Sequence, residues 1–323
     1  MRRTELGATG MELSRIGFGA WAVGGGDYKF GWGRQSDGDS IAAIHRALEL
    51  GVNWIDTAAV YGLGRSERVV ASALRGVEPR PFVFTKASRV VDESGTIVGN
   101  LHRASIRREL EASLDRLNVD ALDLYQIHQP IPDEDIEEGW TTLVELKREG
   151  LIRHIGVSNF TVAQLERIGA IAPVATLQPP YSLLARQIED TTLPYCRQHG
   201  IGVIAYSPMA SGLLTGAMSA ERVSRLPADD WRSRDPRFHE PQLGANLELA
   251  RRLGEIGKRH GVSAGSVAVA WVLRQPGICG AIVGFRHPAQ VDEIVGAASI
   301  DLDAAEVAEL EGAWSGRRDT IAR

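Results

Sequence analysis

Short runs of β-branched and other apolar residues alternate along the chain with longer stretches in which apolar residues recur at helical spacing. This alternation is typical of repeated βα units, which build a parallel sheet with helices around it. The apolar runs predict strands at Ile16–Gly19, Asn53–Asp56, Phe82–Lys86, Leu122–His128, Ile152–Ser158, Val174–Gln178, Gly202–Tyr206 and Gly280–Val283. The amphipathic stretches predict helices at Asp39–Leu50, Ser66–Arg75, Arg103–Leu117, Ile136–Glu149, Ala163–Ile171, Ile188–Gln198, Ala245–His260 and Pro288–Ala297.

The number of βα units favours a closed barrel. Eight units over 323 residues fit an α/β fold of the (β/α)8 TIM-barrel type, whereas a doubly wound sheet usually has fewer strands or a visible second domain. Thr4–Ile16 predicts an additional N-terminal hairpin that turns at Thr9-Gly10 and covers the bottom of the barrel. Ser263–Arg274 and Asp303–Trp314 predict extra C-terminal helices outside the repeat.

One long segment interrupts the alternation of strands and helices. Ser207–Gly244 is polar, rich in Pro, Asp and Arg, and much longer than an ordinary βα connection. We interpret it as either a functional lid or a flexible insertion. No low-complexity tract or linker divides the chain, which predicts a single domain over residues 1–323.

Composition and charge point to a small-molecule partner. The 36 basic and 41 acidic side chains give a net charge of −5 without a long run of like charge, so we expect neither nucleic acid nor a membrane surface as partner. Cys196 and Cys279 have no metal-ligand spacing and fit a reducing compartment, although a disulfide between them stays open. Met1–Glu5 lacks the apolar stretch of a signal peptide, and the apolar run Val267–Leu273 is too short to span a bilayer. We therefore expect a cytoplasmic location.

Four titratable residues fall at or just after predicted strand ends. Parallel barrels place their active sites there because the βα loops converge at the carboxyl ends of the strands. The rule selects Asp56, Tyr61, Lys86 and His128. A phenol with an ordinary pKa of about 10 is a poor acid at neutral pH, so we expect Lys86 to lower the pKa of Tyr61 and Asp56 to keep Lys86 charged. With His128 donating a second hydrogen bond to a carbonyl oxygen, the four form a proton-transfer site.

Carbonyl reduction at such a site needs a source of hydride. No side chain supplies hydride, so a nicotinamide or a flavin is required. No Gly-x-Gly-x-x-Gly motif follows a strand, and Gly24–Gly26 is interpreted as a flexible loop. For metal chemistry, His128 and Asp56 are candidate ligands, but a catalytic metal commonly needs three and no third residue has convincing spacing. We predict no metal.

Five motifs resemble those of the aldo-keto reductase family, in the family's order and over nearly the whole chain. Asp56–Gly62 (DTAAVYG) resembles the signature after the second strand, and Lys86 and His128 stand where the rest of a catalytic tetrad belongs. Gly156–Phe160 and Ala205–Pro208 resemble two further family segments. The resemblance implies carbonyl reduction with NADPH extended across the top of the barrel.

The resemblance also implies which residues would contact NADPH. Ser158, Asn159 and Gln178 would hold the carboxamide, and Tyr206 would stack on the nicotinamide ring. Arg286, at the start of a predicted helix, would clamp the adenosine 2′-phosphate. The implied contacts are Ala20, Trp21, Asp56, Ser158, Asn159, Gln178, Tyr206, Ser207, Pro208, Met209, Ala210, Ser211, Gly212, Gly284, Phe285, Arg286, Gln290 and Glu293.

A segment and a single residue add detail to the expected cofactor and substrate contacts. The backbone of segment 207–212 is implied to follow the pyrophosphate, since small residues let N–H groups approach phosphates. Gln129 stands where a tryptophan is frequent in the family, which implies a more polar or roomier substrate wall. The sequence thus predicts an NADPH-dependent oxidoreductase acting on aldehyde, ketone or sugar-like carbonyls. The alternatives are an NADP(H)-binding, redox-sensing regulatory subunit and a metal-dependent barrel hydrolase or isomerase; the oligomeric state stays open.

Overall fold

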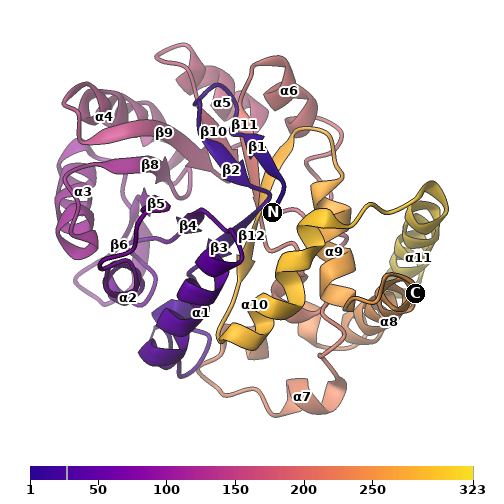
Figure 1. Ribbon diagram of the computed structural model, residues 1–323. Helices are drawn as coiled ribbons and strands as arrows, with labels where there is room; N and C mark the ends of the chain where they lie inside the picture. Colours follow the sequence, from indigo (N-terminus) through magenta and orange to yellow (C-terminus); the bar gives the residue numbers. More distant parts are fainter. Residues whose placement is uncertain (27, 323) are drawn as a thin grey trace.

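Eight parallel strands close into a barrel surrounded by helices (Figure 1). The computed structural model describes residues 1–26 and 28–322, with the backbone alone for residues 316–322. Around the barrel the strand order is β10-β11-β12-β3-β4-β5-β8-β9, so each strand lies beside its neighbours in the chain and the last pairs with the first. The barrel strands are β3 (Ile16–Gly19), β4 (Trp54–Asp56), β5 (Phe82–Ala87), β8 (Leu122–Ile127), β9 (Ile152–Ser158), β10 (Thr176–Gln178), β11 (Gly202–Tyr206) and β12 (Ile278–Gly284).

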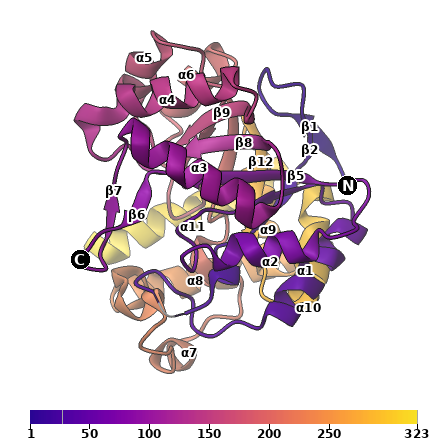
Figure 2. The same ribbon diagram turned by 90° about the vertical axis from the view of Figure 1, so that its left-hand side faces the viewer.

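One helix follows each barrel strand, and the helices surround the barrel, as Figures 1 and 2 show. These helices are α1 (Asp37–Glu49), α2 (Arg65–Ala73), α3 (Arg103–Leu117), α4 (Ile136–Arg148), α5 (Val162–Gly169), α6 (Thr192–Gln198), α8 (Gln242–His260) and α10 (Pro288–Ile294). The predicted extra helices are confirmed as α9 (Ala264–Leu273) and α11 (Ala304–Ala322). The (β/α)8 barrel predicted from the sequence is therefore confirmed, and within the described residues no helix is both long and apolar enough to traverse a bilayer.

The predicted N-terminal hairpin covers the bottom of the barrel. Its strands β1 (Arg3–Glu5) and β2 (Glu12–Ser14) pair antiparallel, and Leu6, Met11 and Leu13 pack with barrel-interior side chains. Gly7 has φ +53°, and a Cβ there would lie 2.5 Å from the backbone nitrogen of Gly202, at the start of β11. Only glycine fits this close approach, which seals the end of the barrel opposite the strand carboxyl ends.

Several element bounds differ from the sequence prediction, and two differences have a local physical cause. The helix expected at Ile188–Gln198 begins at Thr192, because Pro194 lacks an N–H and is tolerated only in the first helical turn. A second hairpin, β6 (Arg89–Val91) with β7 (Ile97–Gly99), was not predicted and lies between β5 and α3. Its turn is fixed by the Asp92 carboxylate, which accepts hydrogen bonds from the backbone N–H groups of Ser94 and Thr96.

The long segment 207–244 is folded over the top of the barrel rather than extended. It contains the 3-10 helices η3 (Ala210–Gly212), η4 (Trp231–Arg234) and η5 (Pro236–Phe238) and the short helix α7 (Ala220–Ser224). Phe238 within it is fully buried in the main core, and Arg232 is buried beside Asp230. Phe238 and Arg232 therefore hold the segment against the rest of the protein.

Candidate active site

The strand register brings polar side chains to one end of the barrel. Asp56 is the last residue of β4, and Lys86 in β5 lies opposite Gln126 in β8. Ser158 and Gln178, the last residues of β9 and β10, lie opposite each other. Parallel strands end at the same edge, so these side chains meet at the carboxyl end of the barrel, as the sequence predicted.

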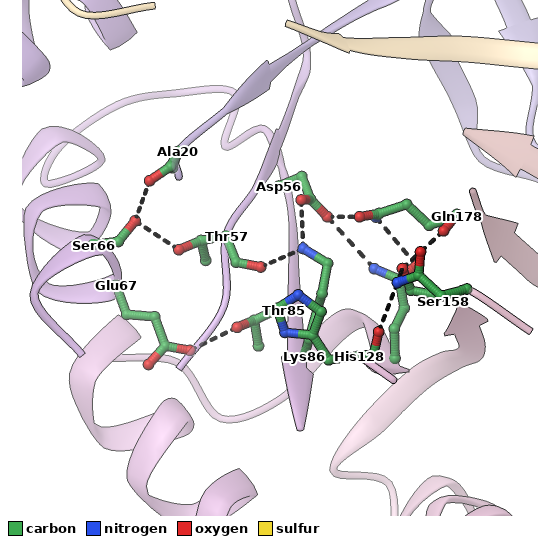
Figure 3. A network of polar contacts seen from close by, with 12 residues as sticks. Ala20, Asp56, Thr57, Ser66, Glu67, Thr85, Lys86, His128, Ser158 and Gln178 are labelled. Atoms are coloured by element: carbon green, nitrogen blue, oxygen red, sulfur yellow. Dashed lines mark hydrogen bonds and ion pairs between the residues drawn. The ribbon is translucent and has the colours of Figure 1, made fainter. Parts of the chain in front are cut away.

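A buried ion pair lies at the centre of this cluster (Figure 3). The Lys86 ammonium is 2.5 Å from Asp56 Oδ1 and also donates to the Thr57 carbonyl oxygen at 2.9 Å; the two charged side chains are 0% and 3% exposed. The second Asp56 oxygen accepts from Gln178 at 2.9 Å and from Gln126 at 3.5 Å. Extra hydrogen bonds of this kind are what a buried ion pair needs to offset its desolvation.

Tyr61 and His128 stand beside the ion pair and line the cavity above it. Their rings meet edge to face, with centroids 5.6 Å apart. The Lys86 ammonium lies 5.2 Å from the centroid of the Tyr61 ring. His128 Nδ1 is buried and has no hydrogen-bond partner among the described residues. A phenol and an imidazole thus share one wall of the cavity.

The surroundings set the protonation states of these groups. Burial, followed by the nearby Asp56 carboxylate, raises the pKa of Tyr61 well above its ordinary value. Burial lowers the pKa of Lys86, an effect that Asp56 opposes. Burial and then the charges of Lys86 and Arg89 hold the pKa of His128 well below its ordinary value. At neutral pH Tyr61 is therefore a protonated donor and His128 is uncharged.

One expectation about this site is wrong. From the sequence we expected Lys86 to lower the pKa of Tyr61, but in the structure burial raises that pKa. The hydrogen bonds of the Lys86 ammonium go to Asp56 and to the Thr57 carbonyl oxygen, and the ammonium lies 5.2 Å from the centroid of the Tyr61 ring. The desolvation of the phenol therefore dominates.

Amide and hydroxyl side chains extend the cluster along the barrel top. Ser158 donates to the Gln178 carbonyl oxygen at 2.7 Å, and Asn159 donates to the His128 carbonyl oxygen at 3.0 Å. Tyr206 donates through its hydroxyl to the Asn159 side-chain oxygen at 2.9 Å. Gln178, Ser158 and Asn159 thus form a fixed polar wall that could hold a carboxamide.

The segment after β11 has a backbone suited to an anion. Ser207, Ala210 and Ser211 all have positive φ although none is glycine, and Gly212 follows with φ +99°. Tight turns of this kind can form concave backbone sites for anions. The N–H groups of Ala210 and Gly212 donate to the Ser207 and Met209 carbonyl oxygens, so the turn is held by its own hydrogen bonds. The segment is a candidate place for the pyrophosphate of a dinucleotide.

Arg286 stands at the far end of the same cavity. Its Nε donates to the Gln35 side-chain oxygen at 2.7 Å, and its Nη2 donates to the Arg34 carbonyl oxygen. Both acceptors are neutral, and the nearby Arg232 and Arg222 help to lower the pKa of Arg286 after burial itself. The Arg286 guanidinium forms no ion pair among the described residues, although the charge of Asp230 opposes the effect of the two arginines on its pKa. A guanidinium of this kind can still bind a phosphate.

The structure brings nearly all of the predicted residues to one cavity of about 590 Å³. Lys86 and Ala210 are the predicted residues that lie behind the cavity wall, where Lys86 supports Asp56. The others line the cavity: Ala20, Trp21, Asp56, Tyr61, His128, Ser158, Asn159, Gln178, Tyr206, Ser207, Pro208, Met209, Ser211, Gly212, Gly284, Phe285, Arg286, Gln290 and Glu293.

Sequence reasoning missed other residues of the cavity and its support. Gln126 was findable, because it precedes His128 by two positions and alternate residues of a strand share a face. Tyr28, Phe30 and Trp32 lie in the loop after β3, whose shape depends on contacts with the distant segment 207–244. Arg89 lies in the hairpin that was not predicted.

Among the described side chains, one group brings three potential metal-ligand atoms together: His102, Asp135 and Glu138. It lies outside the residues that line the cavity, and His102 and Glu138 are exposed. This group gives no support to metal chemistry inside the barrel.

Comparisons with known proteins agree with the geometry. The model of the "Aldo/keto reductase family" matches residues 15–315. Aldo-keto reductase YhdN of Bacillus subtilis is 39% identical over 296 residues, which cover 91% of this chain and 88% of that protein. The NADH-specific methylglyoxal reductase of Escherichia coli is 35% identical over 320 residues, covering 95% and 96%. The structure of glycerol dehydrogenase AKR11B4 from Gluconobacter oxydans superposes with a TM-score of 0.87 at 36% identity, covering 98% of this chain and 96% of that one.

The fold, the site and these relatives define a (β/α)8-barrel oxidoreductase that reduces carbonyl groups. The chain belongs to the aldo/keto reductase family. The substrate of this family member is a small-molecule carbonyl compound.

Proposed function

We propose that the protein reduces aldehyde, ketone or sugar-like carbonyls with NADPH, and that Asp56, Tyr61, Lys86 and His128 form its proton-transfer site. The observation that supports this most is the meeting of a protonated phenol and a neutral imidazole above a buried ion pair. Because Tyr61 and His128 can both donate to a substrate oxygen, the site favours an enzyme over a purely regulatory subunit.

When bound, the nicotinamide would supply hydride to the carbonyl carbon. Tyr61 donates its proton to the carbonyl oxygen, so the C=O π bond breaks while a C–H and an O–H bond form. His128 donates a hydrogen bond to the same oxygen and stabilises the charge that develops there. Lys86 and Asp56 exchange no proton with the substrate. They position Tyr61.

The cofactor would lie along the cavity in the direction that the sequence implied. Ser158, Asn159 and Gln178 would hold the carboxamide, and Tyr206 would stack on the ring. Segment 207–212 would take the pyrophosphate. The remaining contacts would come from Ala20, Trp21, Asp56, Gly284, Phe285, Arg286, Gln290 and Glu293.

The preference for NADPH rests on Arg286. Its charge has no carboxylate partner among the described residues, and two further arginines raise the local positive potential. The 2′-phosphate of NADPH would complete this site, whereas NADH would leave it empty. Because one relative carries the name NADH-specific methylglyoxal reductase, cofactor choice varies among similar chains and needs a direct test.

Titration of NADPH and NADH into the wild type and Arg286→Ala provides that test. We expect the wild type to bind NADPH at least tenfold more tightly, which corresponds to about 1.4 kcal/mol, and Arg286→Ala to lose most of this difference. NADH affinity should change little in the variant. Equal affinity of the wild type for the two cofactors would contradict the role of Arg286.

We also propose a reducing, cytoplasmic location and a small-molecule rather than a nucleic-acid partner. Cys196 and Cys279 are both buried free thiols, and burial raises the pKa of Cys196 to about 12, which makes it unreactive at neutral pH. These properties suit a compartment in which thiols stay reduced.

A further inference from the structure

An arginine without a counter-ion lies at the substrate end of the cavity. Arg89 is the first residue of β6, three positions after Lys86, and it lines the cavity together with His128, Gln129 and Ile131. Arg89 is partly buried. Its charge is close enough to His128 to help lower the pKa of that imidazole.

The other arginines that line the cavity have partners. Arg232 forms an ion pair with Asp230, Arg222 donates to the Ala217 carbonyl oxygen, and Arg286 donates to Gln35. Among the described residues, no ion pair or side-chain hydrogen bond involves the Arg89 guanidinium, and burial is what lowers its pKa.

The carboxylates of the cavity cannot neutralise Arg89. Asp56 and Glu293 are the acidic residues in the described lining. Asp56 is paired with Lys86, and Glu293 lies on α10 beside the cofactor end, near Arg286. A partly desolvated cation with no partner is costly unless a ligand supplies the opposite charge.

The backbone that carries Arg89 is held in place. Ser88, just before it, donates its backbone N–H to Glu109 at 3.0 Å and accepts from the Asn100 N–H at 3.1 Å. Gly99, opposite Arg89 in the hairpin, packs so closely that a Cβ would lie 2.2 Å from the Ile131 carbonyl oxygen. The guanidinium is therefore presented from a fixed element, as a recognition group should be.

We propose that the carbonyl substrate carries an anionic group, a carboxylate or a phosphate, and that Arg89 binds this group while Tyr61 and His128 face the carbonyl oxygen. This proposal rests on the proposed function. The phosphates of the cofactor are assigned to segment 207–212 and Arg286, so they leave Arg89 free. Gln129, beside Arg89 in the lining, adds a polar side chain to the same wall.

Matched substrate pairs test the proposal. The pairs are 4-oxobutanoate with butanal, for a carboxylate, and glyceraldehyde 3-phosphate with glyceraldehyde, for a phosphate. For at least one pair we expect the wild type to show a kcat/KM at least tenfold higher for the charged member, the size of effect given by a hydrogen bond to a charged group. The pair that shows the preference identifies the anion.

Two variants and one control assign the preference to Arg89. Arg89→Gln should reduce the charged-to-neutral ratio at least tenfold, and Arg89→Lys, which keeps the charge without the planar fork, should retain part of it. The control is Arg148→Gln, which removes an exposed arginine at the end of α4 and should leave the ratio unchanged.

Two outcomes contradict the proposal separately from the proposed function. The proposal would be overturned if the wild type had the same kcat/KM for the neutral and the charged member of both pairs. It would also be overturned if Arg89→Gln left the charged-to-neutral ratio of kcat/KM unaltered. Failure to reduce any of the four compounds with either cofactor would instead overturn the proposed function, and this proposal with it.

Discussion

Two positions near the site stabilise charged groups away from water in different ways. Lys86 and Asp56 are buried as a pair, and both have further hydrogen bonds to Thr57 and Gln178. Glu109 on α3 is a half-buried carboxylate that forms no ion pair among the described residues. It accepts from the Ser88 N–H at 3.0 Å and from the Ser105 hydroxyl at 3.3 Å.

Glu109 gives a prediction about stability and pH. Burial, together with the charge of Glu67, raises its pKa from 4.5 to about 7, while the Ser88 N–H, the Ser105 hydroxyl and Arg108 act in the opposite direction. The folded state therefore holds this proton more tightly than the unfolded state. The stability that protonated Glu109 contributes is fully present below pH 4.5 and is lost as the pH rises through 7.

Urea unfolding of wild type and Glu109→Gln at pH 5 and pH 8 measures this effect. The free energy of unfolding of the wild type should fall, relative to the variant, by about 2 kcal/mol between the two pH values. Glutamine keeps an oxygen that can accept from Ser88, so the hairpin anchor survives. A constant difference between the two proteins would contradict the raised pKa.

At the residue scale, the sequence predicted the strand-end side chains well. Asp56, Lys86, His128 and Gln178 were found because parallel strands end at one edge. In the structure Asp56 bonds to both Lys86 and Gln178, and His128 lines the same cavity. The direction of the Tyr61 pKa could not be predicted, because it depends on the balance of burial and nearby charge in the folded cavity.

At the scale of elements, segment 207–244 closes over the cavity and contacts the loop that follows β3. The Trp231 N–H donates to the Gly31 carbonyl oxygen at 3.1 Å, and the Arg232 guanidinium lies 4.7 Å from the centroid of the Trp32 ring. Arg222 and Arg225, in contrast, are exposed. This segment joins both sides of the cavity mouth and is a candidate lid.

Limited trypsin digestion tests the lid. Without cofactor we expect early cleavage after Arg222 or Arg225, and saturating NADPH should slow it at least fivefold, because segment 207–212 would bind the pyrophosphate. Cleavage after the remote Arg148 serves as the internal control and should keep its rate. If NADPH slows cleavage at Arg148 and in the segment equally, or at neither site, the segment is a passive insertion.

The hairpin β6–β7 was not predicted because its strands are too short for a pattern of apolar residues to be recognised. Its strands are three residues each, and their apolar residues Val90, Val91, Ile97 and Val98 are partly exposed or exposed. Such short runs carry too few positions to show a period. The turn sequence from Asp92 to Thr96, with its Asp and Gly, was the available signal.

At the scale of the molecule, one barrel core holds the elements together. The main cluster of buried apolar side chains extends from Ile16 in β3 to Leu310 in α11, and the N-terminal hairpin packs on a second cluster inside the barrel. We propose that residues 1–323 form a single domain. The barrel could be predicted from the sequence because each βα unit repeats the same pattern, whereas the shape of the long loops depends on contacts between distant segments.

Calorimetry with and without NADPH tests the single domain. We expect one unfolding transition, and NADPH at 100 times its Kd should move the whole transition upwards, since the bound state gains about 2.7 kcal/mol. A second transition that NADPH leaves in place would show that part of the chain unfolds independently of the site.

We propose that Tyr61 donates the proton to the carbonyl oxygen, and Tyr61→Phe is the decisive variant because it removes the hydroxyl alone. We expect Tyr61→Phe to turn over a carbonyl that the wild type reduces about 10²- to 10⁴-fold more slowly, the range typical of a lost general acid. Its NADPH affinity should stay within about twofold of the wild type. Tyr195→Phe, at a tyrosine on α6 outside the cavity, is the matched control and should turn over normally. Near wild-type turnover of Tyr61→Phe in the reductive direction would contradict the assignment of the proton-transfer site.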